Sequence, residues 1–516
     1  MRRHVAIGLT VMAMLSVGIL GACSSEGDDT ASTPTGTSEV GTETATATPS
    51  VTTTVEASQA PGVAATPFAG EEDIQYAEVT PDIAGLSSHT DSNQGEPYKY
   101  FETWPTLEGF PVLADEAGSQ VTSWRQSFED QIGPPVPGSP IMQEFNASYS
   151  FIVASGDVIG IRFQVYEFPG AGGVNLSHTL WFDLQSGEAV PSTALLDGDA
   201  ALQQVSDLAI EALKRDRPDL NIPGGIEDGA SPTDEHYHSL GFTPDGDLIV
   251  EFDEYQVGPG SSGSPRVLIP ADVVAPLLSD FGRRAQAEVM SPSDSLDLPD
   301  TTAAVTPSAT TPPTGGVDCS VEACIALTFD DGPSGPTTEL LDLLRDRGVH
   351  VTFFVVGVNA TYQPSTVARA AAEGHEIGNH TFDHRDLTML SKELITDQIT
   401  RTSDVIEAAT GKRPTLLRPP YGATDDKVAA TAGMPLILWS IDPRDWADHD
   451  SQLVTQRVLD AASRGDIVLL HDIHETSVQA VPAILDGLAE RGLVPVTVSE
   501  LLGSDLVAGQ SYRRAS

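Results

Sequence analysis

The chain has 516 residues, enough for two or more domains of ordinary size. Its 27 Lys and Arg against 74 Asp and Glu leave a formal net charge of -47, which excludes a nucleic-acid binder that works through a basic face. The same balance argues against electrostatic docking on anionic lipid. Most of the acidic excess precedes residue 319, and we interpret it as a solubility or high-salt adaptation.

The first residues have the pattern of an export signal. A short basic start is followed by an apolar run from Val5 to Leu20 and by two small residues before Cys23. The run is short for a membrane-spanning helix. The small pair and Cys23 resemble the bacterial lipobox, which implies cleavage after the signal at 1–22 and a lipid on Cys23. An ordinary cleaved signal and an uncleaved anchor helix are the alternatives.

Two segments rich in Thr, Ser and Pro divide the chain. Residues 23–73 form a predicted tether and residues 285–318 a predicted disordered linker, because such compositions cannot bury a core. They leave folded stretches at 74–284 and 319–505, with a tail at 506–516. We therefore expect an exported lipoprotein at the outer face of the bacterial membrane or in the cell wall.

The stretch 74–284 is predicted to be an α+β domain. Alternating and helical apolar patterns indicate a hairpin, further strands and one helix, at residues 148–154, 158–166, 179–184, 199–215, 241–252 and 266–270. No His, Cys or carboxylate groups in it show ligand spacing. His236 and His238 alternate on a polar segment, and we interpret both as surface residues rather than ligands.

The turns and aromatic residues of this stretch follow a recognisable order. Phe182-Asp-Leu, Phe242-Thr-x-Asp-Gly, Tyr255-x-Val-x-Pro and Val267-x-Ile-Pro resemble the sensor domain of RsiV-type anti-sigma factors. In that family the domain recognises lysozyme, and it also precedes some peptidoglycan deacetylases. The resemblance implies a binding or positioning module with lysozyme as a possible partner.

The stretch 319–505 alternates strand and helix signals. Such alternation predicts parallel βα units, hence a layered α/β sheet or a barrel. The predicted strands are 325–329, 351–356, 436–439 and 467–470, and the predicted helices are 337–347, 364–373, 391–410 and 452–464. In barrels the reacting groups lie at the C-terminal ends of the strands.

Two groups of candidate residues follow predicted strands. Asp330 and Asp331 are adjacent on a tight turn, where one carboxylate can bind a cation while the other acts as a base. His380 and His384 stand at i and i+4, and their imidazoles face the same way if this segment is helical. Two His and one carboxylate make a three-ligand site with open positions, the catalytic pattern for zinc.

Three further motifs complete a family pattern. The five motifs in chain order are Thr328-Phe-Asp-Asp-Gly, His380-Thr-x-x-His384, Arg418-Pro-Pro-Tyr421, Asp442-x-x-Asp445-Trp446 and Leu469-Leu-His471. Residues 319–505 thereby resemble the polysaccharide deacetylases, the NodB-homology domain of carbohydrate esterase family 4. The resemblance implies a distorted (β/α) barrel with fewer than eight regular strands, preceded by a smaller α+β domain.

The resemblance also implies roles for single residues. Asp331, His380 and His384 would hold a divalent metal, usually zinc, and Asp330 would be the general base. Arg418 would hold Asp330 and keep it ionised.

The remaining motif residues would complete the reaction. The backbone N–H of Tyr421 would stabilise the oxyanion, and His471 would protonate the leaving amine. Asp445 would orient His471 and raise its pKa, while Trp446 and Leu469 would wall the acetyl pocket.

We therefore predict a metal-dependent hydrolase that removes N-acetyl groups from an extracellular glycan, with peptidoglycan as the expected substrate. Within the enzyme class, a chitin-oligosaccharide deacetylase or an acetylxylan esterase is the alternative. From another class, the alternative is a catalytically silent lysozyme- or glycan-binding lipoprotein. We interpret the other residues near the motifs as structural. Asp383 and Asp386 are expected to be solvated, Asp442 to brace its loop and His474 to lie at the surface. Asp425 and Asp426 are expected to cap the N-terminus of a helix.

If Cys23 carries a lipid, Cys319 and Cys324 remain as a close pair. In an oxidising compartment such a pair predicts a disulfide. A zinc site is the alternative, and the absence of a second Cys/His pair nearby in the sequence argues against it.

Overall fold

The structure is a computed structural model. It describes residues 74–80, 83–95, 97–132, 143–170, 172–220, 222, 225–293, 295–296, 298, 317–503 and 505–515. The predicted signal, Cys23 and the tether lie outside these residues. Among the helices of the described part, none combines the length and the apolar character needed to cross a membrane.

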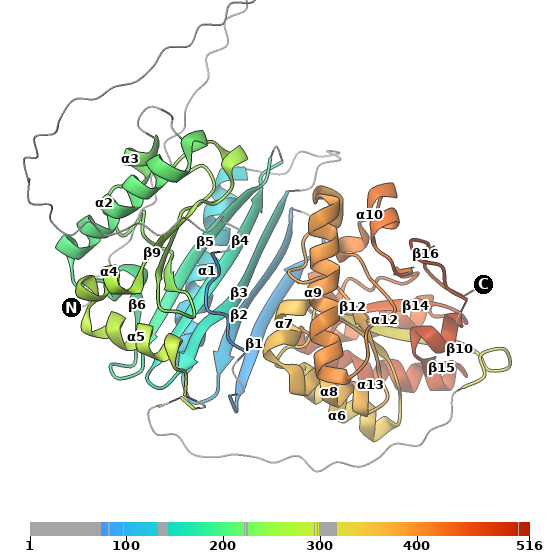
Figure 1. Ribbon diagram of the computed structural model, residues 1–516. Helices are drawn as coiled ribbons and strands as arrows, with labels where there is room; N and C mark the ends of the chain where they lie inside the picture. Colours follow the sequence, from blue (N-terminus) through green and yellow to red (C-terminus); the bar gives the residue numbers. More distant parts are fainter. Residues whose placement is uncertain are drawn as a thin grey trace, which may run out of the picture. The chain divides into compact units, whose positions relative to one another are not determined.

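A six-stranded sheet dominates the first folded stretch (Figure 1). Its strands run in sequence order: β1 (Leu86–Asn93), β2 (Lys99–Leu107), β3 (Glu144–Ser155), β4 (Val158–Phe168), β5 (Val174–Asp183) and β6 (Glu188–Pro191). Neighbouring strands are antiparallel except β2 and β3, which are parallel because helix α1 (Pro111–Ile132) connects them. The predicted hairpin of β3 and β4 is confirmed.

A smaller antiparallel sheet completes this domain. It contains β7 (Leu240–Phe242), β8 (Leu248–Glu251) and β9 (Arg266–Ile269), with helices α2 (Asp199–Asp216), α3 (Gly225–Gly229), α4 (Ala271–Val274) and α5 (Asp280–Met290). Short 3-10 turns are η2 (Ser192–Leu195), η3 (Pro218–Leu220), η4 (Gly260–Ser262) and η5 (Ala275–Leu277). Trp181 of β5 is fully buried in the core that this sheet shares with α2 and α5.

Two predictions about this domain are wrong. The linker does not begin at residue 285, because Ala285 and Val289 of α5 are buried in the core and extend the helix beyond the predicted boundary. The domain is also not the smaller of the two. Its elements run from Leu86 to Met290, whereas those of the second domain run from Cys324 to Tyr512.

The second domain alternates strands and helices as predicted. Its elements are β10 (Cys324–Asp330), α6 (Thr337–Arg347), β11 (Thr352–Val355), α7 (Gly357–Tyr362), α8 (Pro364–Ala372), β12 (Glu376–Asn379), η6 (Leu387–Met389), α9 (Lys392–Thr410), η7 (Pro420–Gly422), α10 (Asp426–Thr431), β13 (Leu436–Ile437), α11 (Asp445–Asp448), α12 (Ser451–Ala461), β14 (Ile467–His471), α13 (Glu475–Glu490), β15 (Val494–Val496), α14 (Val498–Leu502) and β16 (Ser511–Tyr512). Strands β12, β11, β10 and β14 are neighbours in this order and parallel.

Single-residue bridges close these strands into a ring. Leu417 makes parallel bridges to Asn379 on one side and to Leu436 on the other, and Ile441 makes one to Val468 of β14. The ring therefore contains irregular strands between β12 and β14, which is the distorted barrel that the family resemblance implied. At the start of β10, Cys319 and Cys324 form a disulfide with an S–S distance of 2.01 Å.

Candidate active site

The C-terminal end of β10 presents the two adjacent carboxylates. Asp330 is the last residue of the strand, and its Oδ1 accepts a hydrogen bond of 2.7 Å from Nη1 of Arg418. The same nitrogen lies 2.7 Å from Oγ1 of Thr328, and both Asp330 and Arg418 are buried. Oδ2 of Asp330 is buried without a hydrogen-bond partner among the described residues, and Nε2 of His380 lies 3.7 Å from it. The carboxylate is thus fixed through one oxygen and leaves the other available.

Asp331, His380 and His384 converge on one point. Oδ1 of Asp331 lies 3.3 Å from Nε2 of His380 and 3.1 Å from Nε2 of His384. None of these three atoms has a hydrogen-bond partner in the described structure, although all are buried. Burial alone would raise the pKa of Asp331, but the imidazoles of His384 and His380 hold it well below its usual range.

A second contact fixes the tautomer of His380. Its Nδ1 lies 2.6 Å from the carbonyl oxygen of Arg418, which only accepts, so Nδ1 carries the proton and Nε2 keeps its lone pair. A buried lone pair facing a carboxylate oxygen requires a proton or a cation between them. This donor set of two imidazole nitrogens and a carboxylate fits a divalent metal such as zinc.

The two histidines do not lie on a helix, contrary to one condition of the prediction. They follow β12 in a loop in which Thr381 and His384 have φ values of 67° and 62°. Asp331 and Tyr421 also have positive φ, at 74° and 60°. Strained backbone of this kind costs about 1–3 kcal/mol per residue and concentrates at functional sites. Here it turns the two imidazoles toward Asp331.

His471 faces the carboxylates from the neighbouring strand end. Its Nδ1 lies 2.9 Å from Oδ1 of Asp445, and its backbone N–H donates to Oδ2 over 2.8 Å. Ser477 donates a third hydrogen bond of 2.6 Å to the same carboxylate. Burial opposes the imidazolium charge, but Asp445 outweighs it and raises the pKa of His471 to about 10. An imidazolium at this position can donate a proton from Nε2.

The remaining predicted residues lie around this centre. Tyr421 packs its ring against His384 at 4.7 Å, and Leu469 is fully buried on β14 beside Thr328 of β10. Trp446 is partly buried in α11, directly after Asp445. The structure thus brings together, at one end of the barrel, the charged and imidazole side chains that the motifs predict, with the ring of Tyr421 against His384: Asp330, Asp331, His380, His384, Arg418, Asp445 and His471.

Two neighbouring residues, His474 and Asp386, are more buried than predicted, and Asp425 is a helix cap as predicted. His474 is buried rather than at the surface, and burial lowers its pKa to about 4. Asp386 is buried too, and its carboxylate forms an ion pair with Nζ of Lys99 at 2.7 Å. Asp425 does cap a helix, since its side chain accepts from the backbone N–H of Val428 at the start of α10.

The first domain also contributes residues to this centre. Ser92 at the end of β1 donates a hydrogen bond of 2.7 Å to Oδ2 of Asp331, and Nε2 of Gln94 lies 2.8 Å from Nε2 of His471. Phe101 of β2 stacks on His384 with 4.8 Å between ring centroids. These contacts explain why the carboxylates and imidazoles have almost no exposed surface. No sequence signal indicated them, because the residues are more than 200 positions from their partners.

Together these groups place a carboxylate, an imidazole and a candidate cation site at one end of a barrel, an arrangement suited to metal-dependent hydrolysis. Known proteins agree. Residues 318–436 match the polysaccharide deacetylase family, and residues 195–272 match a family of unknown function, DUF3298. The chain is 32% identical over 441 residues to the peptidoglycan-N-acetylmuramic acid deacetylase PdaC of Bacillus subtilis, a similarity that covers 83% of this chain and 89% of that protein. The chain belongs to the polysaccharide deacetylase family, whose members are metal-dependent.

Other relatives match a shorter part of the chain. The peptidoglycan-N-acetylglucosamine deacetylase PgdA of Listeria monocytogenes is 43% identical over 189 residues, covering 36% of this chain and 41% of that protein. A solved structure of PdaC from Bacillus subtilis is 43% identical and covers 36% of this chain and 92% of that chain, with a TM-score of 0.35.

Proposed function

We propose that the protein is a peptidoglycan N-deacetylase that uses a divalent metal, zinc, held by Asp331, His380 and His384. The observation that carries this proposal is the convergence of three unpartnered, buried donor atoms beside Asp330 and opposite His471. The relatives named for peptidoglycan support the substrate, and one of them is similar along 83% of this chain, both folded stretches included.

The residues around the centre divide the chemistry of amide hydrolysis. The metal would supply Lewis-acid polarisation of the acetyl carbonyl and would make water a stronger acid. Asp330 accepts the proton of the attacking water through its free Oδ2, while Arg418 keeps the carboxylate in position through Oδ1. Proton transfer by a positioned base contributes roughly 10²–10⁴-fold in rate.

The opposite side of the centre serves the leaving group. His471 donates its Nε2 proton to the departing sugar nitrogen, and Asp445 holds the imidazole by its Nδ1. The backbone N–H of Tyr421 donates to the developing oxyanion. Trp446 and Leu469 enclose the acetyl methyl group.

Acetate release from purified peptidoglycan tests the proposal. The full chain would be assayed with zinc, with a chelator, and as Asp330→Asn, with chitin oligomers and acetylated xylan in parallel. We expect metal-dependent release from peptidoglycan that is lost in the variant. Mass analysis of the product disaccharides then distinguishes N-acetylmuramic acid from N-acetylglucosamine as the sugar attacked.

The other outcomes each overturn a defined part of the proposal. Release only from chitin or xylan would retain the chemistry and reject the peptidoglycan substrate. No release from any polymer by a folded, zinc-loaded chain would favour a glycan- or lysozyme-binding lipoprotein without catalysis.

We further propose a lipid on Cys23 and a binding role for residues 74–284 toward lysozyme or glycan. The sequence supports the first through the small residues before Cys23, and the second through the resemblance to the sensor domain. Incorporation of labelled palmitate, abolished in Cys23→Ala, tests the lipid. Retention of lysozyme by the immobilised full chain tests the binding role, and a chain that retains neither lysozyme nor glycan strands would reject it.

A further inference from the structure

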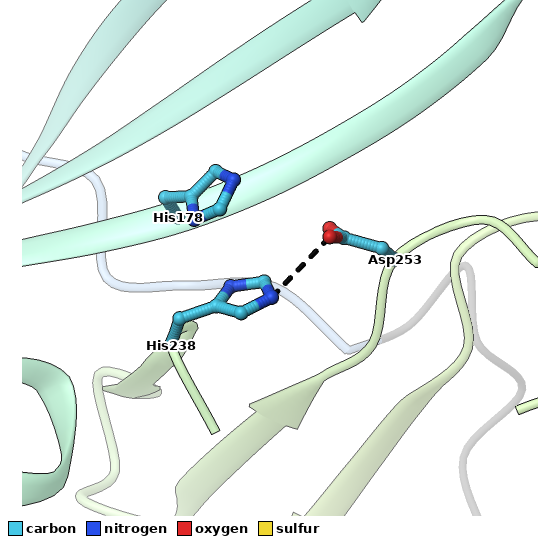
Figure 2. A group of neighbouring side chains, drawn as sticks. All are labelled: His178, His238 and Asp253. Atoms are coloured by element: carbon cyan, nitrogen blue, oxygen red, sulfur yellow. Dashed lines mark ion pairs between the residues drawn. The ribbon is translucent and has the colours of Figure 1, made fainter. Parts of the chain in front are cut away.

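A second group of metal-ligand side chains lies in the first domain, away from the barrel. Figure 2 shows His178, His238 and Asp253 pointing toward one another. His178 comes from β5, His238 from the segment that precedes β7, and Asp253 from the segment that follows β8. One ligand atom of each lies within 4.8 Å of the others. The prediction that this stretch has no such group is wrong, because three separate elements assemble it.

The backbone of Ser177 orients two of the three side chains. Its carbonyl oxygen lies 3.1 Å from Nδ1 of His238, and its N–H donates a hydrogen bond of 2.7 Å to Oδ1 of Asp253. A carbonyl only accepts, so Nδ1 of His238 carries the proton and Nε2 points at Oδ2 of Asp253, 3.3 Å away. A carbonyl that binds the second imidazole nitrogen is the usual support of a metal-bound histidine.

The third side chain is held by its ring faces rather than by hydrogen bonds. His178 stacks between Trp124, at 4.4 Å, and His238, at 4.2 Å between ring centroids. Neither of its ring nitrogens forms a hydrogen bond with any described residue. Either ring nitrogen can therefore carry the lone pair that a cation needs while the other keeps its proton, and the imidazole is half-buried.

We propose that His178, His238 and Asp253 bind a divalent zinc-type cation with two imidazole nitrogens and one carboxylate oxygen. Donor atoms bound tetrahedrally at about 2.0–2.1 Å lie roughly 3.3 Å apart, the separation between His238 and Asp253 here. The donor set is the same as that of Asp331, His380 and His384. The contact of His238 with the carbonyl of Ser177 likewise corresponds to that of His380 with the carbonyl of Arg418.

The position of this site indicates a structural role. Its ligands join β5 of the six-stranded sheet to segments at the ends of β7 and β8 in the three-stranded sheet. A cation bound there links the two sheets, so its binding free energy adds to the stability of the folded domain. The site lies on a domain that carries none of the barrel residues, so the proposal stands apart from the proposed deacetylation.

Zinc stoichiometry of the full chain, measured at a buffered free zinc concentration, tests the proposal. We expect two zinc ions per chain in the wild type, one in Asp331→Asn, and none in Asp331→Asn combined with His238→Ala. Asp253→Asn is a gentler variant, because its amide oxygen still accepts from Ser177, and it should weaken the second zinc at least tenfold. The matched control is His236→Ala, two residues from His238, which should keep both ions.

Thermal unfolding supplies an independent readout. In the Asp331→Asn background zinc should raise the unfolding temperature saturably, and the addition of His178→Ala should remove that rise. One zinc ion in the wild type, lost entirely in Asp331→Asn, would overturn the proposal and leave an imidazolium–carboxylate pair of His238 and Asp253. Retention of the second zinc in folded His178→Ala and Asp253→Asn would also overturn it.

Discussion

Asp330 and His471 are register partners at the C-terminal ends of two neighbouring parallel strands, β10 and β14. Adjacent strands thus place a carboxylate and an imidazole on either side of one point. Each group then has a partner of the opposite charge type. Asp330 contacts the guanidinium of Arg418, and His471 contacts the carboxylate of Asp445. Arg418 fixes the position of the Asp330 carboxylate, and Asp445 favours the protonated form of the His471 imidazole, which are the two groups of the proposed base and acid.

Replacement of Asp330 by Asn should remove the base and leave the metal ligands intact. We expect kcat to fall by roughly 10²–10⁴-fold, because the amide cannot accept the proton of the attacking water. Zinc binding should persist, since Asp331, His380 and His384 are unchanged. Steady-state kinetics and zinc stoichiometry, measured on the same preparation, check both parts, and Asp383→Asn is a matched control on a neighbouring carboxylate.

Asp445→Asn should shift the pH dependence of the reaction. The carboxylate of Asp445 raises the pKa of His471 to about 10, so its removal lowers that pKa and the imidazolium is lost at lower pH. The alkaline limb of the kcat profile should therefore move toward neutral pH. An alkaline limb that stays in place in the variant would contradict the assignment of His471 as the acid.

The Ser92 and Gln94 contacts have a consequence for substrate access. Nε2 of Gln94 lies 2.8 Å from Nε2 of His471, where the departing sugar nitrogen would lie, and an amide N–H can donate there only to a neutral imidazole. The Gln94 contact therefore has to break before His471 can act as an imidazolium. Ser92 donates a hydrogen bond to Oδ2 of Asp331. We therefore expect a glycan to reach the centre only after these contacts break, which would reduce its apparent affinity. At about 1 kcal/mol per hydrogen bond, Gln94→Ala should raise kcat/KM roughly fivefold, and the double variant with Ser92→Ala should raise it further.

The matched control for this experiment is Gln126→Ala, since Gln126 is exposed on α1 and its amide donates a hydrogen bond to the nearby Asp130. Its kcat/KM should equal that of the wild type. If Gln94→Ala has unchanged or reduced activity on peptidoglycan, the Gln94 contact does not limit access, and its side chain serves the closed structure alone.

The sequence predicted the barrel site more completely than its surroundings. The proposed ligands, base and acid lie at or just after strand ends, and the order of five short motifs singled them out without knowledge of the backbone. The local geometry was less predictable. His380 and His384 stand at i and i+4, but a strained loop rather than a helix brings their imidazoles together. His474 looked like a surface residue because the elements that bury it are distant in sequence.

The first domain shows more clearly what sequence patterns cannot predict. His178 and His238 are 60 positions apart, and only the pairing of β5 with the segment before β7 makes them neighbours. Ser92 and Gln94 belong to no recognisable sequence motif. Their place at the centre became apparent only from their contacts with Asp331 and His471. Hydrophobic periodicity predicts elements such as α2, but it does not predict which side chains from separate elements will meet.

A buried charge cluster in the first domain should control its acid stability. Glu251 of β8 accepts hydrogen bonds of 2.8 Å from Arg162 and from Arg266, and its side chain is fully buried. Burial alone would raise the pKa of Glu251, but the two guanidinium groups outweigh it and lower the pKa to about 2. Because the folded-state pKa lies below the ordinary 4.5, this group stabilises the fold fully above pH 4.5, and the stability is lost as pH falls through about 2.

Glu251→Gln should therefore lower the free energy of unfolding by about 3 kcal/mol near neutral pH, because it removes the carboxylate that faces the buried guanidinium of Arg162 and the partly exposed one of Arg266. The unfolding temperature should fall by roughly 6–12 °C. The difference from the wild type should shrink between pH 4.5 and 2, since the wild-type carboxylate becomes protonated there. Thermal melts across this pH range check the sign, with Glu211→Gln on the exposed face of α2 as the control. A difference that stays constant down to pH 2 would show that packing, rather than the charge of Glu251, accounts for the loss.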